Sequence, residues 1–231
     1  MQIPRNMKGS QTQSGFTLIE IAIVLVIIGL LLGGVLQGQQ LIENSRVRNA
    51  VNTFNGIAAA AFSYQDRYGR MPGDDGPLQT NLSVRGGAWA NIPTANGNAD
   101  GILTATAANT FSGNATSEGS FFFTHLRAAG FITGDPTTAP GTAAILPTNP
   151  FGGLVGVTGE TLFTNMNGNK ICMSNVPGSA AIALDTQMDD GSPDSGRFRG
   201  NQDTSGVLPQ STTTAATAYN ENNNYTICYR M

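Results

Sequence analysis

Two pairs of adjacent carboxylates are the residues of this sequence best suited to acid–base chemistry. Asp74 and Asp75 follow a Pro-Gly dipeptide, and Asp189 and Asp190 precede a Gly-Ser-Pro tripeptide. Two neighbouring carboxyl groups can serve as general acid and general base. In Gly- and Pro-containing turns, however, Asp usually bonds nearby backbone amides and remains solvated. We therefore predict turns at both places and no catalysis.

Other side chains that catalyse reactions or bind metals are scarce. The 231 residues include one histidine, His125, and two cysteines, Cys172 and Cys228. Structural zinc sites use four Cys or His ligands, and no Ser-His-Asp pattern is visible. We expect His125 to be a core or polar-face residue of a short helix and not a ligand. Among the functions that the sequence suggests, an enzyme attached to a membrane has the least support.

A possible calcium loop begins at Asn96. Asn96, Asn98 and Asp100, followed by Gly101, match the opening of the D-x-[DN]-x-[DN]-G pattern. Only one of these three ligands is charged, and Ala107 occupies the position of the bidentate Glu. We predict a tight turn and no cofactor. The alternative is weak calcium binding that also uses the carboxylate of Asp189, Asp190 or Asp194.

The composition is that of a polar, weakly charged exported protein. Charged residues make up 12% of the chain, the net charge is −3, and 29 residues are glycine. A soluble domain ordinarily has about 25% charged residues. The net negative charge gives no indication of a basic face for nucleic acid, so a nucleic-acid partner is not expected.

The longest apolar segment is a candidate membrane span. Phe16 to Leu36 contains fifteen Phe, Leu, Ile or Val residues and one charge, Glu20. Their insertion gain, roughly 5–9 kcal/mol, exceeds a penalty of about 3 kcal/mol for the acid. The apolar run is too long for a secretory signal and lacks an A-x-A cleavage pattern. Arg5 and Lys8 precede the run, which predicts a cytoplasmic N-terminus and an exported remainder.

Glu20 must be neutralised in this position. A carboxylate in apolar surroundings must protonate, reach the interface or find a cation. Cleavage after Gly15 would give Phe16 an α-ammonium group in the same environment. The alternative is an interfacial glutamate on a simple membrane anchor.

Gly15-Phe16-Thr17-Leu18-Ile19-Glu20, followed by a long apolar helix, resembles the N-terminus of type IV pilins and type II secretion pseudopilins. This resemblance covers about 25 residues. It implies cleavage after Gly15 by an inner-membrane aspartyl prepilin peptidase and N-methylation of Phe16. It also implies that Glu20 pairs with the Phe16 amine of a neighbouring subunit during filament growth.

One helix is predicted from Phe16 to about Tyr68, because no proline lies between Pro4 and Pro72. Gly29 to Gly38 forms its expected flexible segment. Beyond Leu36 apolar residues recur at helical spacing and predict one buried stripe. The stripe consists of Val47, Ala50, Phe54, Ile57, Ala61, Tyr64 and Tyr68.

From Gly69 onwards, long loops are expected around short strands. Strands are predicted at 154–157, 170–175, 180–184 and 225–229. Phe121 to Ala129, closed by Gly130, predicts a helix that buries Phe122, Phe123 and Leu126. Trp89 is expected to be core packing for a loop.

Cys172 and Cys228 each lie in a predicted strand of an exported chain, which favours a disulfide between them. Closing this loop would stabilise the fold by roughly 4 kcal/mol in the chain-entropy view. A reactive thiol pair is the alternative, but the spacing is not C-x-x-C.

We predict an α+β fold of ladle shape, with a long N-terminal helix packed on a small antiparallel sheet with long loops and a C-terminal disulfide region. Its parts are a removed leader (1–15), the membrane and filament-core half of the helix (16–38), and a head (39–231) that includes the second helix half (39–68).

The predicted function is a structural subunit of a type IV pilus-like filament, a helical homo-oligomer. Its other partners would be the prepilin peptidase, the pilus or type II assembly machinery and, before assembly, the inner membrane. The subunit would end in an extracellular pilus or a periplasmic pseudopilus. The alternatives are a type II secretion pseudopilin, or a minor tip subunit that acts as an adhesin or in DNA uptake.

Overall fold

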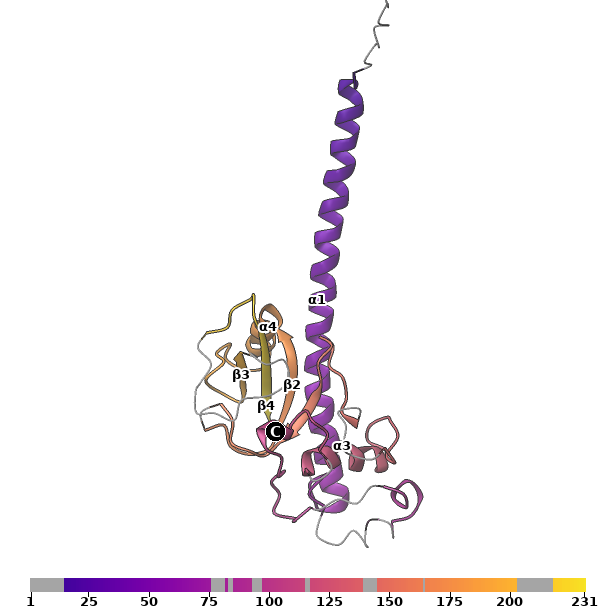
Figure 1. Ribbon diagram of the computed structural model, residues 1–231, viewed down its shortest axis with the longest axis vertical. Helices are drawn as coiled ribbons and strands as arrows, with labels where there is room; N and C mark the ends of the chain where they lie inside the picture. Colours follow the sequence, from indigo (N-terminus) through magenta and orange to yellow (C-terminus); the bar gives the residue numbers. More distant parts are fainter. Residues whose placement is uncertain are drawn as a thin grey trace, which may run out of the picture. The chain divides into compact units, whose positions relative to one another are not determined.

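A computed structural model describes residues 15–75, 82, 85–92, 97–114, 117–138, 145–163, 165–202 and 218–231. The chain divides into two compact units, residues 1–43 and 44–231. The longest element, α1, runs from Leu18 to Tyr68 and contributes to both units (Figure 1). The predicted domain boundaries at 15/16 and 38/39 stay predictions.

The first unit contains the apolar half of α1. Every large hydrophobic side chain from Phe16 to Ile42 is exposed. This half is long and apolar enough to cross a membrane by length and composition, and none of its most apolar window is buried. The helix continues without a break through Gly29 to Gly38, where a Cβ atom would meet no neighbour. Helix geometry is therefore compatible with these glycines, and their predicted flexibility stays a prediction.

The second unit uses the other half of α1 as a core element. Six of the seven predicted stripe residues are buried, and Tyr68 is half-buried. Ala60 joins the buried stripe. The ring of Phe54 packs edge-on against Phe198 at 5.6 Å and Tyr229 at 6.0 Å between ring centroids. The helical period in the sequence correctly predicted which side of this helix half is covered.

The sheet has four antiparallel strands in the order β1-β2-β4-β3. Its members are β1 (Val155–Thr158), β2 (Lys170–Pro177), β3 (Phe198–Gln202) and β4 (Asn224–Arg230). The predicted strands at 154–157, 170–175 and 225–229 are confirmed. The sequence did not predict β3, whose FRGNQ segment contains Gly, Arg and Asn, residues with little strand preference. The long helix, the small antiparallel sheet and the disulfide confirm the predicted α+β fold class.

The prediction of a strand at 180–184 is wrong. This segment lies in a helix, α4 (Gly178–Met188). Its buried positions Ala180, Ala181, Leu184 and Asp185 are spaced as one side of a helix, not as alternate residues of a strand. Ala and Leu are strong helix formers, and here that preference outweighs the short apolar run that suggested a strand.

A second short helix, α3, spans Glu118–Ala128, close to the predicted 121–129. Gly130 follows with a φ of 78°, and the amide of Phe131 donates to the carbonyl of Leu126. This is the expected glycine-terminated helix end. The predicted core residues Phe122, Phe123 and Leu126 are buried.

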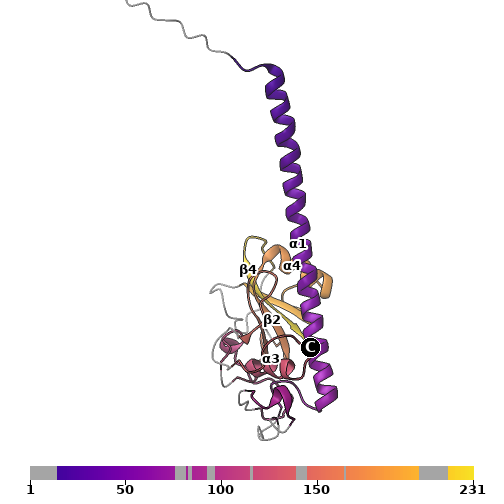
Figure 2. The ribbon, with the colours of Figure 1, turned by 90° about the vertical axis from the view of Figure 1, so that its right-hand side faces the viewer.

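Both short helices lie against the sheet, α3 at β1 and α4 at β2, β3 and β4 (Figure 2). Two 3-10 helices complete the regular elements of the described residues, η1 (Gly87–Trp89) and η2 (Ala107–Asn109). The side chain of Trp89 is buried in the core, as expected.

A disulfide joins Cys172 in β2 to Cys228 in β4. The two residues are direct partners across these neighbouring strands, with Cα atoms 4.0 Å apart, and both are buried. The bond therefore links the two central strands of the sheet.

Candidate functional site

The segment that carries the predicted cleavage site begins ahead of α1. Gly15 and Phe16 are exposed, and Phe16 retains 85% of its accessible surface. A Cβ atom at Gly15 would meet nothing within 4 Å. The fold of this chain therefore does not require glycine at position 15. Cleavage after Gly15 and methylation of Phe16 stay predictions.

Glu20 is held at the start of α1 by Thr17. The amide and the hydroxyl of Thr17 both donate to Glu20 Oε2, each at 2.8 Å. The amide of Glu20 donates in turn to Thr17 Oγ1 at 3.4 Å. This reciprocal pair is a capping box, which satisfies amides that the first helical turn leaves unpaired. Sequence reasoning identified Glu20 but missed Thr17, although the T-x-x-E spacing is the usual signal.

In the second unit, the turn after α1 makes hydrogen bonds to several other segments of the chain. The amide of Gly73 donates to Nδ1 of His125 at 2.9 Å. The carboxylate of Asp74 accepts hydrogen bonds from the amides of Ala99 at 2.5 Å and Gly101 at 2.7 Å. One short turn therefore holds both α3 and the loop at 97–101.

Asp75 connects the same turn to a third segment. Its Oδ2 accepts a hydrogen bond from the hydroxyl of Tyr64 at 2.6 Å. The same oxygen forms an ion pair with Nη1 of Arg85 at 2.8 Å. The Arg85 guanidinium lies over the rings of Tyr68 at 4.3 Å and Trp89 at 4.8 Å. Burial, followed by the neighbouring Asp75, raises the pKa of Tyr64 above its ordinary value.

The expectation that Asp74 and Asp75 are solvated is wrong, since both are buried. The prediction of a turn is right, but the carboxylates face inward and take their partners from the protein. A buried acid is tolerated only when its oxygens are satisfied by hydrogen bonds or charges. Both groups are occupied in holding the fold.

The possible calcium loop is arranged around different groups. Asn96 lies outside the described residues. Asn98 and Asp100 bond one another: Asn98 Nδ2 donates to Asp100 Oδ2 at 2.8 Å, and the Asp100 amide donates to Asn98 Oδ1 at 3.1 Å. The remaining Asp100 oxygen accepts the amide of Ile102 at 2.8 Å. These oxygens are thus engaged in a tight turn.

The backbone of this loop binds acidic side chains. The carboxylate of Glu118 accepts hydrogen bonds from the amides of Asn98 at 3.3 Å and Thr104 at 2.6 Å. Asp74 binds other amides of the same loop. Burial, together with the neighbouring charge of Asp74, raises the pKa of Glu118. Because amide protons attract anions, this side of the loop is suited to carboxylates.

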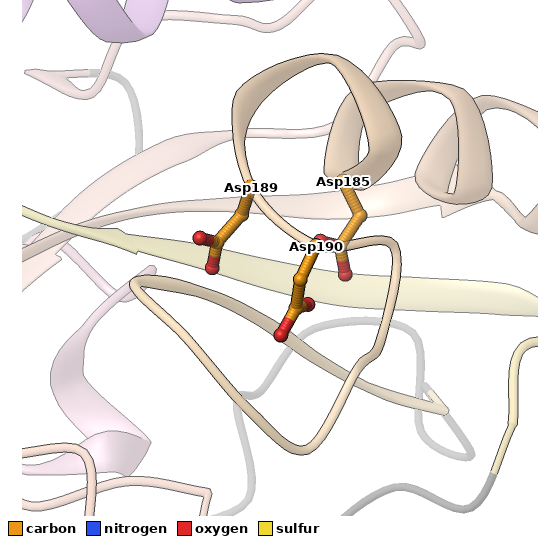
Figure 3. Close-up of side chains that lie close together, drawn as sticks. All are labelled: Asp185, Asp189 and Asp190. Atoms are coloured by element: carbon orange, nitrogen blue, oxygen red, sulfur yellow. The ribbon is translucent and has the colours of Figure 1, made fainter.

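Three carboxylates gather at the end of α4. One oxygen of each of Asp185, Asp189 and Asp190 lies within 4.8 Å of the others, and Figure 3 shows the side chains projecting from the helix end and the loop that follows. Burial, with smaller contributions from the two other acids, raises the pKa of Asp185 to about 6. Asp185 is buried and accepts the Tyr219 hydroxyl at 2.8 Å and the Gly191 amide at 3.0 Å.

The other two acids of this cluster order the loop between α4 and β3. Asp190 accepts hydrogen bonds from within five residues, as the turn prediction implied, whereas the donors to Asp189 lie eight and nine residues further along the chain. The donors are the Arg197 and Phe198 amides to Asp189, and the Ser192 amide and the Ser195 hydroxyl to Asp190. Among the described residues, this cluster does not include Asp100 of the 97–101 loop. The structure thus does not bring Asp189 or Asp190 together with Asp100 as ligands of one ion.

His125 is fully buried beneath aromatic rings. It stacks on Tyr64 at 6.2 Å between centroids and lies 5.7 Å from the Trp89 ring. Because Nδ1 accepts the Gly73 amide, the neutral imidazole is the form that fits. Burial lowers the pKa of His125 to about 4. This is the core role expected for the one histidine of the chain.

The N-terminal segment matches a motif known from other proteins. Residues 10–36 match the prokaryotic N-terminal methylation motif. The chain is 32% identical over 101 residues to the fimbrial protein EcpC of Eikenella corrodens. By these two matches the chain resembles the type IV pilins.

The likeness to that pilin relative is partial. It covers 43% of this chain and 66% of EcpC, so the matched part is just under two thirds of the relative's length. A type IVb pilin from Salmonella typhi, solved by crystallography, aligns with 66% of this chain and 95% of its own, at 20% identity and a TM-score of 0.28.

Gly73→Ala is expected to destabilise the pilin head by more than about 3 kcal/mol, because strain and a clash coincide. The φ of Gly73 is +90°, and a Cβ atom there would lie 2.4 Å from the Glu118 carbonyl oxygen. Gly69→Ala is the matched control, since its φ is +71° but nothing lies within 4 Å of the added atom. It should cost about 1–2 kcal/mol. Denaturant unfolding measures both, and equal losses would contradict the close packing at Gly73.

The buried His125 should make the head less stable in acid. Its pKa is about 4 in the fold against 6.5 when exposed, so unfolding takes up a proton between these pH values. The free energy of unfolding should be fully present above pH 6.5 and fall towards pH 4, by at most about 1.4 kcal/mol per pH unit.

Asp185 and Glu118 have raised pKa values and act in the opposite direction as the pH falls. The difference between the wild type and His125→Gln, which does not titrate, removes their contribution. Denaturant titrations of both proteins across this range test the effect, and parallel stability curves would exclude it.

Proposed function

We propose that this chain is a subunit of a type IV pilus-like filament, and that it polymerises through the first half of α1 after removal of residues 1–15. The observation that carries the proposal is the continuous exposed apolar surface of that half, from Phe16 to Ile42. Burying a single Leu or Ile side chain stabilises by about 1.5–3 kcal/mol. A surface of this size must be covered, first by lipid and then by the same helix of other subunits.

Glu20 places a charge on the surface that lipid or neighbouring helices must cover. It is the one ionisable side chain between residues 16 and 42. Cleavage would release an α-ammonium at Phe16, one residue before the Thr17 that holds the Glu20 carboxylate. Opposite charges on neighbouring subunits would neutralise each other in the apolar surroundings and set the axial position of each new subunit. A structural subunit of this kind requires no enzymatic activity.

The partners and locations follow from the same surface. The precursor would stand in the inner membrane with its head in the periplasm, where a prepilin peptidase and an assembly machinery would act on it. Assembly would transfer the helix from lipid to the filament core.

The name of the fimbrial relative supports a pilus over a periplasmic pseudopilus. Long fibres in surface-sheared material, seen by electron microscopy, would distinguish the two. The mature side chains, ten basic against fifteen acidic, give no support to a DNA-binding tip subunit.

Glu20→Val should leave cleavage after Gly15 intact and reduce filament incorporation by at least about tenfold, since an unpaired amine is left in an apolar core. Glu43→Val is the matched control, because it removes one acid from the same helix beyond the apolar half. Thr17→Ala removes the capping hydroxyl and keeps the charge, so it should have a smaller effect. Intact mass reports cleavage, and immunoblots of sheared fibres report incorporation. Normal fibres built from Glu20→Val would refute the pairing.

We also propose that the subunit folds without a bound cofactor. The carboxylates of Asp74, Asp100 and Glu118 already accept protein hydrogen bonds. Four amides of the 98–104 loop donate to Asp74 or Glu118. A chelator should therefore leave the thermal midpoint of the purified head unchanged, and millimolar calcium should not raise it. A calcium-dependent rise that Asp190→Asn abolishes would instead assign an ion to the acid cluster after α4.

A further inference from the structure

The loop between β1 and β2 contains an Asn-Gly pair with unusual surroundings. The chain has three such pairs, at 55–56, 96–97 and 167–168. Asn55 and Asn167 are both exposed, as are the glycines that follow them. They differ in backbone: Asn55 lies inside α1, whereas Asn167 lies in the connecting loop and Gly168 has a φ of +86°.

We propose that Asn167 is a site of spontaneous deamidation through a cyclic imide formed with Gly168. The backbone nitrogen of Gly168 attacks the side-chain carbon Cγ of Asn167, and a new N–Cγ bond forms. The Cγ–Nδ2 bond breaks, and the amide proton of Gly168 leaves with the nitrogen as ammonia. Water then opens the five-membered ring at either carbonyl, which gives aspartate or isoaspartate. No oxidant, reductant or enzyme is needed.

The electrophile is oriented by a neighbouring hydroxyl. Thr161 Oγ1 donates to Asn167 Oδ1 at 2.6 Å. This hydrogen bond fixes the side-chain amide and draws electron density from Cγ, which favours attack by a nucleophile. It also stabilises the negative charge that develops on Oδ1 when the ring closes.

The nucleophile is accessible. Gly168 has no side chain to hinder approach, and its amide donates to no described residue. The glycine also lies beside an amine, because Nζ of the buried Lys170 donates to the Gly168 carbonyl oxygen. Burial lowers the pKa of Lys170 to about 8, so in mildly alkaline solution a neutral amine is available next to the residue that must lose its amide proton.

Conversion at this position would alter the attachment of a second loop. Asn169 follows directly, and its side chain accepts the Leu103 amide at 2.9 Å and donates to the Gly101 carbonyl at 2.8 Å. Isoaspartate would insert one backbone atom two residues before this anchor, and either product would add a carboxylate. The modification would therefore act on the loop that Asp74 and Glu118 hold from its other side.

Asn55 provides an internal control of equal exposure. Its neighbour Gly56 is in the middle of α1, where the backbone is held in helical geometry. Since the helix must open locally before Gly56 can attack, conversion at Asn55 should be slower by at least about tenfold.

The test follows both sites in the same sample. The full chain is incubated in mildly alkaline buffer and digested at intervals, and mass spectrometry quantifies deamidated and isoaspartyl peptides containing residue 55 or 167. Asn167→Gln should abolish the conversion at 167, because the longer side chain closes a six-membered ring far more slowly. Thr161→Val should slow it while thermal unfolding shows the head still folded.

Accumulation at 167 well ahead of 55, slowed by Thr161→Val, is the expected result. Equal rates at the two sites, or an intact Asn167 when Asn55 has reacted, would overturn the proposal. A rate unchanged in Thr161→Val would overturn the assigned role of the hydroxyl. These outcomes do not depend on whether the subunit assembles into filaments.

Discussion

Two buried carboxylates in one turn organise the second unit of this protein, residues 44–231. Asp74 and Asp75 follow the end of α1, and each satisfies its charge with groups from a different segment. The neighbouring Gly73 adds a third connection, to His125 of α3. Because an unsatisfied buried acid costs several kcal/mol, these segments are fixed relative to the turn as firmly as the apolar core fixes the sheet. Long loops with little regular structure can therefore keep a defined course.

The long helix meets two different physical demands along one continuous backbone. In residues 44–68 one side is covered by the core of the head, and the other carries polar residues. In residues 18–42 every large apolar side chain is exposed. A soluble monomer would gain nothing from such a surface, because the energy of its exposure is recovered only in lipid or against other chains. The capping box at Thr17 and Glu20 lets the helix begin cleanly at its apolar end.

The sequence was most informative where a physical pattern is local. Helical spacing predicted the buried side of α1, and a lone acid in an apolar run identified Glu20. The terminal glycine predicted the end of α3. Long-range features were harder: among the described strands β3 pairs with β4 alone, and its FRGNQ segment has no strand signal of its own. The segment 180–184 was assigned to a strand because a short apolar run fits either element until its neighbours are known. The burial of Asp74 and Asp75 also depends on partners from α1, residue 85 and the 97–101 loop, which no local rule brings together.

The bond between Cys172 and Cys228 lies across the paired strands β2 and β4, and the chain between Pro177 and Asn224 contains α4 and the edge strand β3. The 46-residue excursion between these positions is closed twice, by strand pairing and by sulfur. Lengthening the loops within such a closed segment adds little entropic cost, so insertions can collect between α4, β3 and β4 without disrupting the sheet. A protease that nicks it would leave both pieces covalently attached. The loops best able to vary in sequence are thus also those in which backbone cleavage leaves the two pieces joined by the disulfide.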